Sequence, residues 1–557
     1  MRDYVAWSRP RGVANGTGVH PLIDRRAFLR TGIFVAGAAF GSGLVGCDSG
    51  GFSIPCLGPA PPPTPVAGMT YIRASEIGCA LDCDLRTGRN KYTGGVATDD
   101  GPRINEAMAA ATADNPVTLI IDGSALISGL FLPAGGSWSI AGLGCGTGFF
   151  VKSGTNNDGI RNGPAGAPLP TDPGPPVPAR GANVSLSNFT LNGNQGNGHS
   201  GNSTTGFRQG LKQLWYFGIN LMNLNNITIE KVVVVNTSAY HFRLSNVGNV
   251  TVSGCVMKSY GLNTDGLHFD GPANDIAISS CDFTTGDDSI ALNCPEGYSG
   301  NISRVTVDSC TFNSWSLMRL YTTNYNTNKF NIDTVAVSNC SGKLSEAAFL
   351  IGISGQSNPN SIDGLSISDC QLTAPMVLGL AENFGSIALK NVILMQWQSK
   401  VDWWAPQSNR ICGFVRPSPL YGSVSYVGSS LSFENCQITR SGNLSTAPII
   451  LENDSTIESV TFNGFGILDI GSSKSVPSLM DIGSGSVGQF VIDSVNSTNV
   501  TQPASEFSSV GSVSGAGVLA TGWEFPDAVM VDGVPYISES SGLPSIKING
   551  VVEPYTA

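Results

Sequence analysis

The chain has 557 residues, a formal net charge of −11, 41% hydrophobic residues and 13% charged residues. This hydrophobic content is enough for a sizeable core and argues against disorder, while the acidic balance argues against a general nucleic-acid binder. The chain contains no G-x-x-x-x-G-K-[ST] loop and no C-x-x-C pair, which excludes the usual phosphate-loop nucleotide enzymes and zinc ribbons.

Residues 1–46 have the pattern of an export signal. Arg25 and Arg26 precede an apolar run of 16 residues, from Thr31 to Gly46, which is too short for a membrane span. The paired arginines resemble a twin-arginine signal. The end of the run, Leu44-Val45-Gly46-Cys47, resembles a bacterial lipoprotein cleavage box, so we expect Cys47 to be lipidated. An ordinary secretory signal in which Cys47 is incidental is the alternative.

Removal of residues 1–46 leaves 24 basic and 39 acidic groups, a net charge of −15. Residues 47–70 are rich in proline and form a stiff linker. We therefore expect an exported monomer, periplasmic or on the cell surface, that meets the membrane only through its lipid anchor.

A short helix is expected near the start of the folded region. In the segment that begins at Thr98, Asp99 or Asp100 can cap the helix and Pro102 falls near its first position. We expect this helix to cover one end of the fold that follows, where open strand edges would otherwise pair with other chains. The first strand is predicted to begin at Val117.

The middle of the chain repeats a short alternating triplet. Three residues after each triplet stands a small apolar residue, usually cysteine, and the spacings from 232 to 370 are 23, 26, 29, 30 and 30 residues. The triplets begin at Ile227, Val250, Ile276, Val305, Val335, Leu365 and Leu431, and the residues that follow them are Val232, Cys255, Cys281, Cys310, Cys340, Cys370 and Cys436.

Alternation predicts strands, and units too short to fold alone must stack. The period is close to one turn of a parallel β-helix, an all-β solenoid, which we expect over residues 71–440. Residues 441–557 are then further coils or a C-terminal cap. The cysteines of the coils are expected to form a buried ladder of free thiols rather than disulfides. Cys79 and Cys83 could bond to each other or to Cys56.

Two neighbouring coils carry a cluster of carboxylates. If Leu267 stacks on Ile290, then Asp265 stacks on Asp288 and Asp287 lies beside them, because adjacent coils are about 4.8 Å apart. Crowded like charges raise one another's pKa, so one carboxyl can stay protonated beside an ionised one. Glycosidic bond cleavage needs this pair. The bland alternative is that these aspartates only form turns at strand entrances.

Asn263-Thr264-Asp265-Gly266, followed by Asp287-Asp288, resembles the signature of the polygalacturonase-type glycoside hydrolases, right-handed parallel β-helices of the pectin-lyase-like superfamily. The resemblance implies that Asp287 is the general acid and that Asp265 and Asp288 activate water, with inversion. Acid and base should then stand about 6.5–9.5 Å apart. No cofactor and no metal are implied.

The chain departs from this family in the next coil. Ser314-Trp315-Ser316 stands where the family has Gly-His-Gly, and Arg319-Leu320-Tyr321 only partly matches its Arg-Ile-Lys. Arg319 fits a grip on a substrate carboxylate, whereas Trp315 and Tyr321 suit stacking on a neutral sugar. A polysaccharide substrate is therefore expected more firmly than pectin.

The stacking register also predicts a strip of outward polar side chains beside the carboxylates. One column contains Arg243, His268 and Arg319, and the next contains Asp270, Asn293 and Tyr321. These residues are candidates for sugar binding, and the alternative is an ordinary solvated strand face.

Three functions compete on these residues. The first is an inverting glycoside hydrolase. The second is a polysaccharide lyase with Arg243 or Arg319 as base, in which the acidic patch binds Ca²⁺. The third is a non-catalytic carbohydrate-binding or adhesion solenoid, which the missing histidine and lysine of the family favour.

Overall fold

The computed structural model describes one α-helix and a stack of parallel β-strands. The described residues are 54, 55, 58–155, 157–163, 181, 183–195, 216–259, 263–294, 298–322, 329–352, 361–396, 413–417, 425–441, 447–451, 454–470, 478–496, 510–515, 529–531, 534–536, 545–548 and 551–554. Residues 1–53, 56 and 57 are not among the described residues, so the expected export signal, Cys47, Cys56 and the first part of the proline-rich linker lie outside them.

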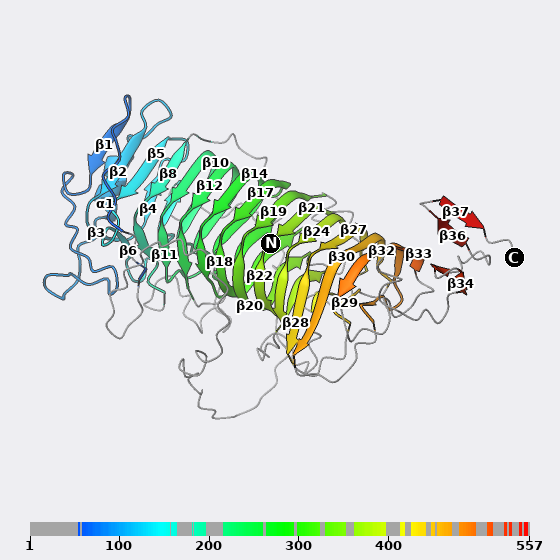
Figure 1. Cartoon of the computed structure of the whole chain (residues 1–557). Helices are drawn as coiled ribbons and strands as arrows, with labels where there is room; N and C mark the ends of the chain where they lie inside the picture. The colour runs from blue at the N-terminus through cyan, green and yellow to red at the C-terminus, as the bar shows by residue number, and fades with distance from the viewer. Residues whose placement is uncertain are drawn as a thin grey trace, which may run out of the picture. The chain divides into compact units, whose positions relative to one another are not determined.

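The strands form three parallel faces that the chain visits in turn (Figure 1). Face 1 consists of β1 (Thr70–Arg73), β2 (Val117–Ile121), β5 (Trp138–Gly142), β8 (Val184–Ser187), β17 (Ile302–Asp308), β19 (Ile332–Ser338), β21 (Ile362–Ser368), β24 (Phe384–Lys390), β27 (Val427–Glu434), β32 (Ser486–Asn496) and β33 (Val510–Ser514). Face 2 consists of β3 (Ser124–Ile127), β6 (Gly148–Val151), β9 (Thr190–Asn192), β11 (Val233–Val235), β13 (Val256–Lys258), β15 (Asp282–Thr284), β22 (Gln371–Ala374), β25 (Ile393–Gln396) and β28 (Gln437–Ser441). Face 3 consists of β4 (Leu130–Leu132), β7 (Ile160–Asn162), β16 (Asp288–Asn293), β23 (Met376–Leu380), β26 (Gly413–Pro417), β29 (Ile449–Ile450) and β31 (Met480–Asp481).

Six long strands bend from one face to the next. β10 (Ile219–Glu230), β12 (Phe242–Ser253) and β14 (Leu267–Ser279) run from face 3 into face 1, β18 (Thr311–Tyr321) and β20 (Ser341–Ile351) run from face 2 into face 3, and β30 (Thr456–Ile470) runs from face 1 into face 2. Beyond the stack, β34 (Val529–Val531) pairs with β35 (Val534–Tyr536), and β36 (Ser545–Ile548) pairs with β37 (Val551–Pro554), both antiparallel.

Parallel strands closed into successive rings confirm the predicted β-helix. The triplets stack in the expected register on face 1, for example Val250 on Ile276 and Ile276 on Val305. The structure adds one coil that the sequence pattern missed, since Ile387 stacks between Leu365 and Leu431. β29 to β33 continue the stack beyond residue 440. The handedness of the coil remains a prediction.

The predicted cysteine ladder is confirmed. Cys255, Cys281, Cys310, Cys340 and Cys370 are free thiols, and each is buried in the core. Because such thiols fill space like small apolar side chains, they close the inner corner of each coil without cross-linking it. Cys79 and Cys83 are also free and buried, whereas Cys145 is disulfide-bonded.

The predicted helix is α1 (Gly101–Met108), with Pro102 in its first turn. Its buried side, which includes Ile104 and Met108, packs against β3 and β4. Asp99 accepts a hydrogen bond from the Gly101 amide at 3.1 Å, while Asp100 accepts from the amides of Ala80 and Leu81 instead. The role of α1 as an end cap of the solenoid remains a prediction. No helix among the described residues is long and apolar enough to cross a membrane.

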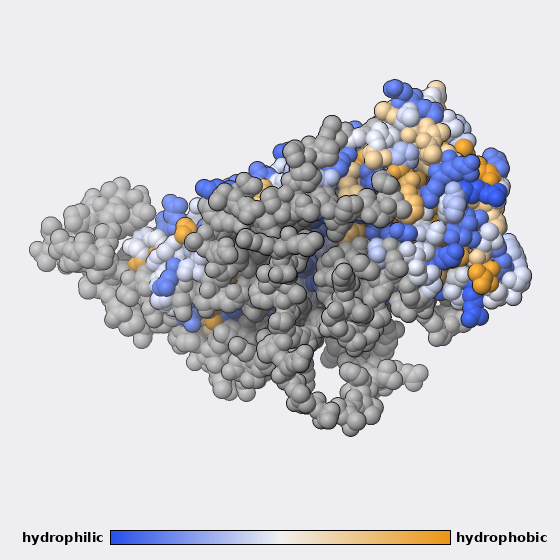
Figure 2. Space-filling view, turned by 180° about the vertical axis from the view of Figure 1, so that it is seen from behind, coloured by the Kyte–Doolittle hydropathy of each residue, from blue (hydrophilic) through white to orange (hydrophobic). Residues whose placement is uncertain are grey.

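The face shown in Figure 2 mixes hydrophilic and apolar residues. In the space-filling view, apolar residues appear in groups interspersed with hydrophilic ones (Figure 2). The most exposed large apolar side chains are Val96 and Tyr92 near the N-terminal end of the stack, followed by Val427, Val66 and Met395.

Candidate active site

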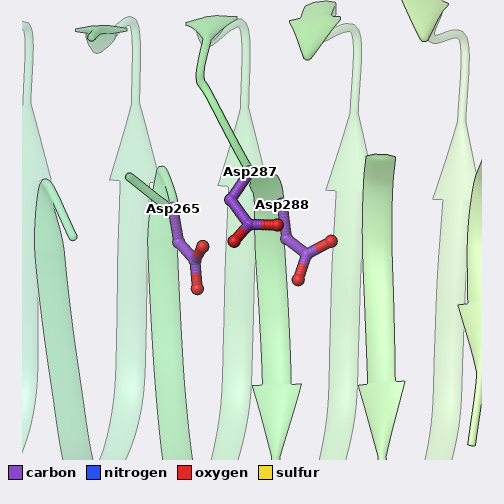
Figure 3. Close-up of side chains that lie close together, drawn as sticks. All are labelled: Asp265, Asp287 and Asp288. Atoms are coloured by element: carbon purple, nitrogen blue, oxygen red, sulfur yellow. The ribbon is translucent and has the colours of Figure 1, made fainter. Parts of the chain in front are cut away.

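The three aspartates lie at the entrance to two neighbouring strands of face 3 (Figure 3). Asp265 stands two residues before β14, Asp287 just before β16, and Asp288 is the first residue of β16. Leu267 pairs with Ile290, as the sequence predicted, and the Gly266 amide donates to the Asp288 carbonyl at 3.0 Å. One oxygen from each carboxylate lies within 4.8 Å of the others.

Hydrogen bonds from the same and neighbouring coils fix this cluster. The Thr264 hydroxyl accepts from the Gly286 amide at 3.0 Å, which ties the two aspartate-bearing turns together. The Ser316 hydroxyl donates to Asp288 Oδ1 at 2.5 Å, and Arg319 Nη1 lies 3.6 Å from Asp288 Oδ2. The two aspartate-bearing turns are therefore tied to each other, and Asp288 is also held by the coil that follows.

Crowding changes the acidity of two of the three carboxyls. Burial, with the charges of Asp288 and Asp265, raises the pKa of Asp287 well above its usual value. Burial and Asp265 raise the pKa of Asp288 to about 6, against the lowering effects of Arg319, Ser316 and His268. One carboxyl of the cluster can thus hold a proton while a neighbour is ionised.

Exposure separates the three side chains further. Asp265 and Asp288 are 4% and 1% exposed, while Asp287 is only partly buried. Asp287 is therefore the carboxyl that a large substrate can reach. The spacing of the carboxylates is closer than the 6.5–9.5 Å expected from the family resemblance, because one coil step brings their oxygens within 4.8 Å.

The two predicted columns of polar residues are in the expected register. Arg243 pairs with His268, and Ala291 pairs with Arg319. Asp270 pairs with Asn293, and Asn293 with Tyr321. The side chains of this strip do not, however, form a solvated face: Arg243, His268, Asp270 and Asn293 are all buried.

Several strip residues bind each other. His268 Nδ1 lies 2.7 Å from Asp265 Oδ2, and His268 Nε2 lies 3.1 Å from Asp270 Oδ1. Asp270 also pairs with Arg243 Nη2 at 2.5 Å and accepts a hydrogen bond from the Ser245 hydroxyl. Since these partners use both oxygens of Asp270, this residue faces its neighbours in the fold.

The remaining candidates lie on the C-terminal side of the aspartates. Arg319 and Tyr321 keep part of their surface exposed, and the Arg319 guanidinium lies over the Tyr321 ring at 5.2 Å. Trp315 is buried against Ala347, Leu350 and Met376. Tyr321 is consequently better placed than Trp315 to meet a sugar ring.

The structure also places residues in the site that sequence reasoning missed. Ser316 bonds Asp288, and the Tyr240 ring stacks on the His268 ring at 3.8 Å. Outside the site, three coils before Asp265, a buried Asp158 binds Arg161 at 3.2 Å and Asn220 at 2.9 Å. Only register could have found these residues, because serine, tyrosine and asparagine are common throughout the chain.

The three carboxylates have the spacing of a possible cation site. However, Arg319 and Ser316 already contact the carboxylate of Asp288, and His268 contacts that of Asp265. We therefore assign no metal to this cluster.

Comparison with known proteins agrees with the motif. Residues 179–313 match the family model of the glycosyl hydrolases family 28. This family 28 match contains all three aspartates, and it confirms the resemblance that the motif indicated. No curated protein sequence matches the chain.

Solved structures resemble the chain at low sequence identity. A family 28 exopolygalacturonase of Yersinia enterocolitica is 11% identical with a TM-score of 0.48, covering 80% of this chain and 78% of that one. An exopolygalacturonase of Thermotoga maritima is 12% identical with a TM-score of 0.48, covering 79% and 93%. A surface adhesin of Streptococcus pneumoniae is 12% identical with a TM-score of 0.47, covering 88% and 99%.

Proposed function

We propose that this protein is a glycoside hydrolase that cleaves a polysaccharide with inversion. The observation that carries the proposal is the cluster of Asp265, Asp287 and Asp288, in which one carboxyl can hold a proton beside ionised neighbours. The family 28 match spans the same residues.

In the proposed reaction Asp287 is the general acid. It gives its proton to the glycosidic oxygen as the bond from the anomeric carbon to that oxygen breaks. The water oxygen bonds to the anomeric carbon from the other side, and the proton it loses goes to the pair Asp265 and Asp288. The next cycle begins when Asp287 takes up a proton and the base pair releases one to solvent.

The burial of the base pair supports inversion over a covalent intermediate. A carboxylate that attacks sugar directly must reach the anomeric carbon, but Asp265 and Asp288 are almost fully buried. A water molecule is small enough to lie between them and a sugar. The close spacing of the carboxylates favours retention instead, since retaining enzymes hold their two carboxyls about 5–5.5 Å apart. The anomer that is released first, followed by proton NMR, decides between the two.

The geometry speaks against a lyase that uses Arg243 as its base. The Arg243 guanidinium is 3% exposed and paired with Asp270 at 2.5 Å, so it is not free to take a proton from a sugar carbon. A lyase would release an unsaturated product that absorbs ultraviolet light, whereas a hydrolase forms new reducing ends without it.

The decisive experiment treats plant and microbial polysaccharides, acidic and neutral, with the full-length protein and with Asp287→Asn. We expect new reducing ends from at least one polymer, and loss of turnover with retained binding in the variant. Asp282→Asn is the matched control, because Asp282 is an exposed carboxylate on the same coil. Unchanged turnover by Asp287→Asn would defeat the acid assignment and favour a binding or adhesion protein.

We also propose that the enzyme is exported and held at the cell envelope by lipidated Cys47. The paired arginines, the short apolar run and the Cys47 motif support this placement.

A further inference from the structure

A continuous chain of contacts leads from Arg243 to Asp265. Arg243 pairs with Asp270, Asp270 contacts His268 Nε2, and His268 Nδ1 contacts Asp265. Every member is at least nine-tenths buried. The Tyr240 ring lies parallel to the imidazole at 3.8 Å, and Phe217 stacks on Tyr240 in turn, so the imidazole cannot rotate freely.

The hydrogen bonds in this chain of contacts determine how many protons the His268 imidazole carries. A neutral imidazole has one donor and one acceptor, but here each ring nitrogen faces a carboxylate oxygen, at 2.7 and 3.1 Å. Asp270 Oδ2 accepts from Arg243 and from the Ser245 hydroxyl, which leaves Oδ1 to accept from Nε2. With Asp265 as the ionised base of the proposed reaction, both contacts are satisfied at once only when the ring carries two protons. The Asn293 amide nitrogen lies further from Nε2, at 3.5 Å.

The balance of buried charge favours the same state. Two carboxylates contact His268 directly, those of Asp265 and Asp270. Two more, Asp287 and Asp288, interact with it through space. Two cations pair with these carboxylates, Arg243 with Asp270 and Arg319 with Asp288. With the acid protonated, three carboxylates and two guanidinium groups leave one excess negative charge. A protonated His268 cancels it, and buried charge is costly unless it is balanced.

We infer that His268 is a positioning residue, which stays protonated between Asp265 and Asp270 and thereby keeps Asp265 oriented in the active site. The inference rests on the proposed function and deepens it. It replaces the sugar-binding role expected for His268, Asp270 and Arg243, because these side chains bind one another and are buried.

The protonation state can be measured without any substrate. In nitrogen-15 NMR of the histidine-labelled full-length protein at neutral pH, His268 should show two protonated ring nitrogens. His241 is a built-in comparison: burial lowers its pKa to about 4, and its Nδ1 contacts the Asp265 carbonyl at 2.7 Å while Nε2 has no hydrogen bond. It should therefore show one protonated nitrogen. The signal that His268→Gln removes identifies His268.

The effect on the reaction is measured by the pH dependence of kcat/KM. The His268 cation is among the effects that lower the pKa of Asp288, so its removal in His268→Gln should move the acidic limb upward by about one pH unit or more. At a pH well below the limb, this shift lowers activity roughly tenfold beyond any loss at the plateau. Ser259→Ala is the control, since Ser259 is buried and accepts from the Thr237 amide but touches no member of the chain of contacts.

Each outcome decides the inference. Two protonated nitrogens on His268 and a shifted acidic limb support it. A singly protonated His268, or a limb that moves no more in His268→Gln than in Ser259→Ala, overturns it. If His268→Gln does not fold, the spectrum of the unaltered protein, assigned with variants of His20, His199 and His241, still decides the protonation. Failure of the wild type to cleave any polysaccharide refutes the proposed function and leaves the NMR result to judge the chain of contacts.

Discussion

The ionisation of Asp288 is a balance of opposing contacts. Burial and the Asp265 charge favour its protonated form, while the Arg319 guanidinium and the Ser316 hydroxyl favour the carboxylate. Burial and the charges of Asp288 and Asp265 raise the pKa of Asp287 well above its usual value. A hydrolase needs an ionised base beside a protonated acid, so activity should fall below about pH 6 as Asp288 takes up a proton.

Ser316→Ala tests this balance. The hydroxyl stabilises the ionised form of Asp288, and without it the pKa of Asp288 rises. A base with a higher pKa is protonated at a higher pH, so we expect the acidic limb of kcat/KM to move upward while the basic limb changes less. The measurement is the pH profile of the variant beside the wild type.

Ser338→Ala provides the control for that profile. Ser338 donates to Asp308 on face 1, far along the chain from the aspartate cluster, and its removal should leave both limbs in place. An acidic limb of Ser316→Ala that stays fixed or moves to lower pH would show that Asp288 is not the titrating base.

At this scale the sequence was informative about register and uninformative about burial. The alternation of Leu267 and Phe269 against Ile290 and Leu292 was sufficient to place Asp265 over Asp288. The position of His268 between Asp265 and Asp270 could not be predicted from the sequence, because it depends on how these two buried side chains are oriented.

Coil packing leaves no room for a side chain at Gly266, the residue between Asp265 and β14. At Gly266 an added Cβ would lie 2.4 Å from the Ser289 carbonyl oxygen and 2.5 Å from the Phe283 ring. Both atoms belong to the next coil, and neither is the end of a flexible side chain. A glycine is therefore required where the two aspartate-bearing turns approach each other.

Gly266→Ala should consequently damage both stability and activity. Overpacking of this kind costs about 1–3 kcal/mol, and relief by backbone movement would displace Asp265 from Asp288. We expect a lower midpoint in urea unfolding and a lower kcat. Gly379→Ala is a matched control on face 3, where the nearest atom to an added Cβ is a Leu350 methyl group at 3.3 Å. Equal midpoints for the two variants would mean that the turns have room to spare.

The elements that sequence could predict are those in which local pattern and packing coincide. Triplets followed by cysteine were found in order from Val250 to Leu365. The coil of Ile387 was missed because its spacing of 22 residues from Leu365 is shorter than that of its neighbours. Its corner residue, Val392, is a small apolar side chain like Val232, so the corner position fits the pattern even where the spacing does not.

At the scale of the whole molecule, the stack is stabilised by repetition. Each coil buries its apolar residues only against the coils before and after it, so the fold tolerates loops of different length between strands. This explains why the parallel β-helix was predictable from a few repeats. The segment before the stack carries no such repeat, and we propose that residues 1–46 and Cys47 serve in export and lipidation instead.

The proposed export signal and the proposed lipidation of Cys47 can be tested separately in a bacterial host with twin-arginine export and lipoprotein processing. Replacing Arg25 and Arg26 by lysine should keep the protein in the cytoplasm, because the receptor reads the arginine pair and not its charge alone. Cys47→Ala should be exported but not lipidated, so it should leave the membrane fraction and lose incorporation of a labelled fatty acid. Ser49→Ala, two residues further on, should behave as the wild type. A Cys47→Ala protein that stays with the membrane and still carries the label would place the anchor elsewhere. Export of the lysine pair at the wild-type level would point instead to the general secretory route.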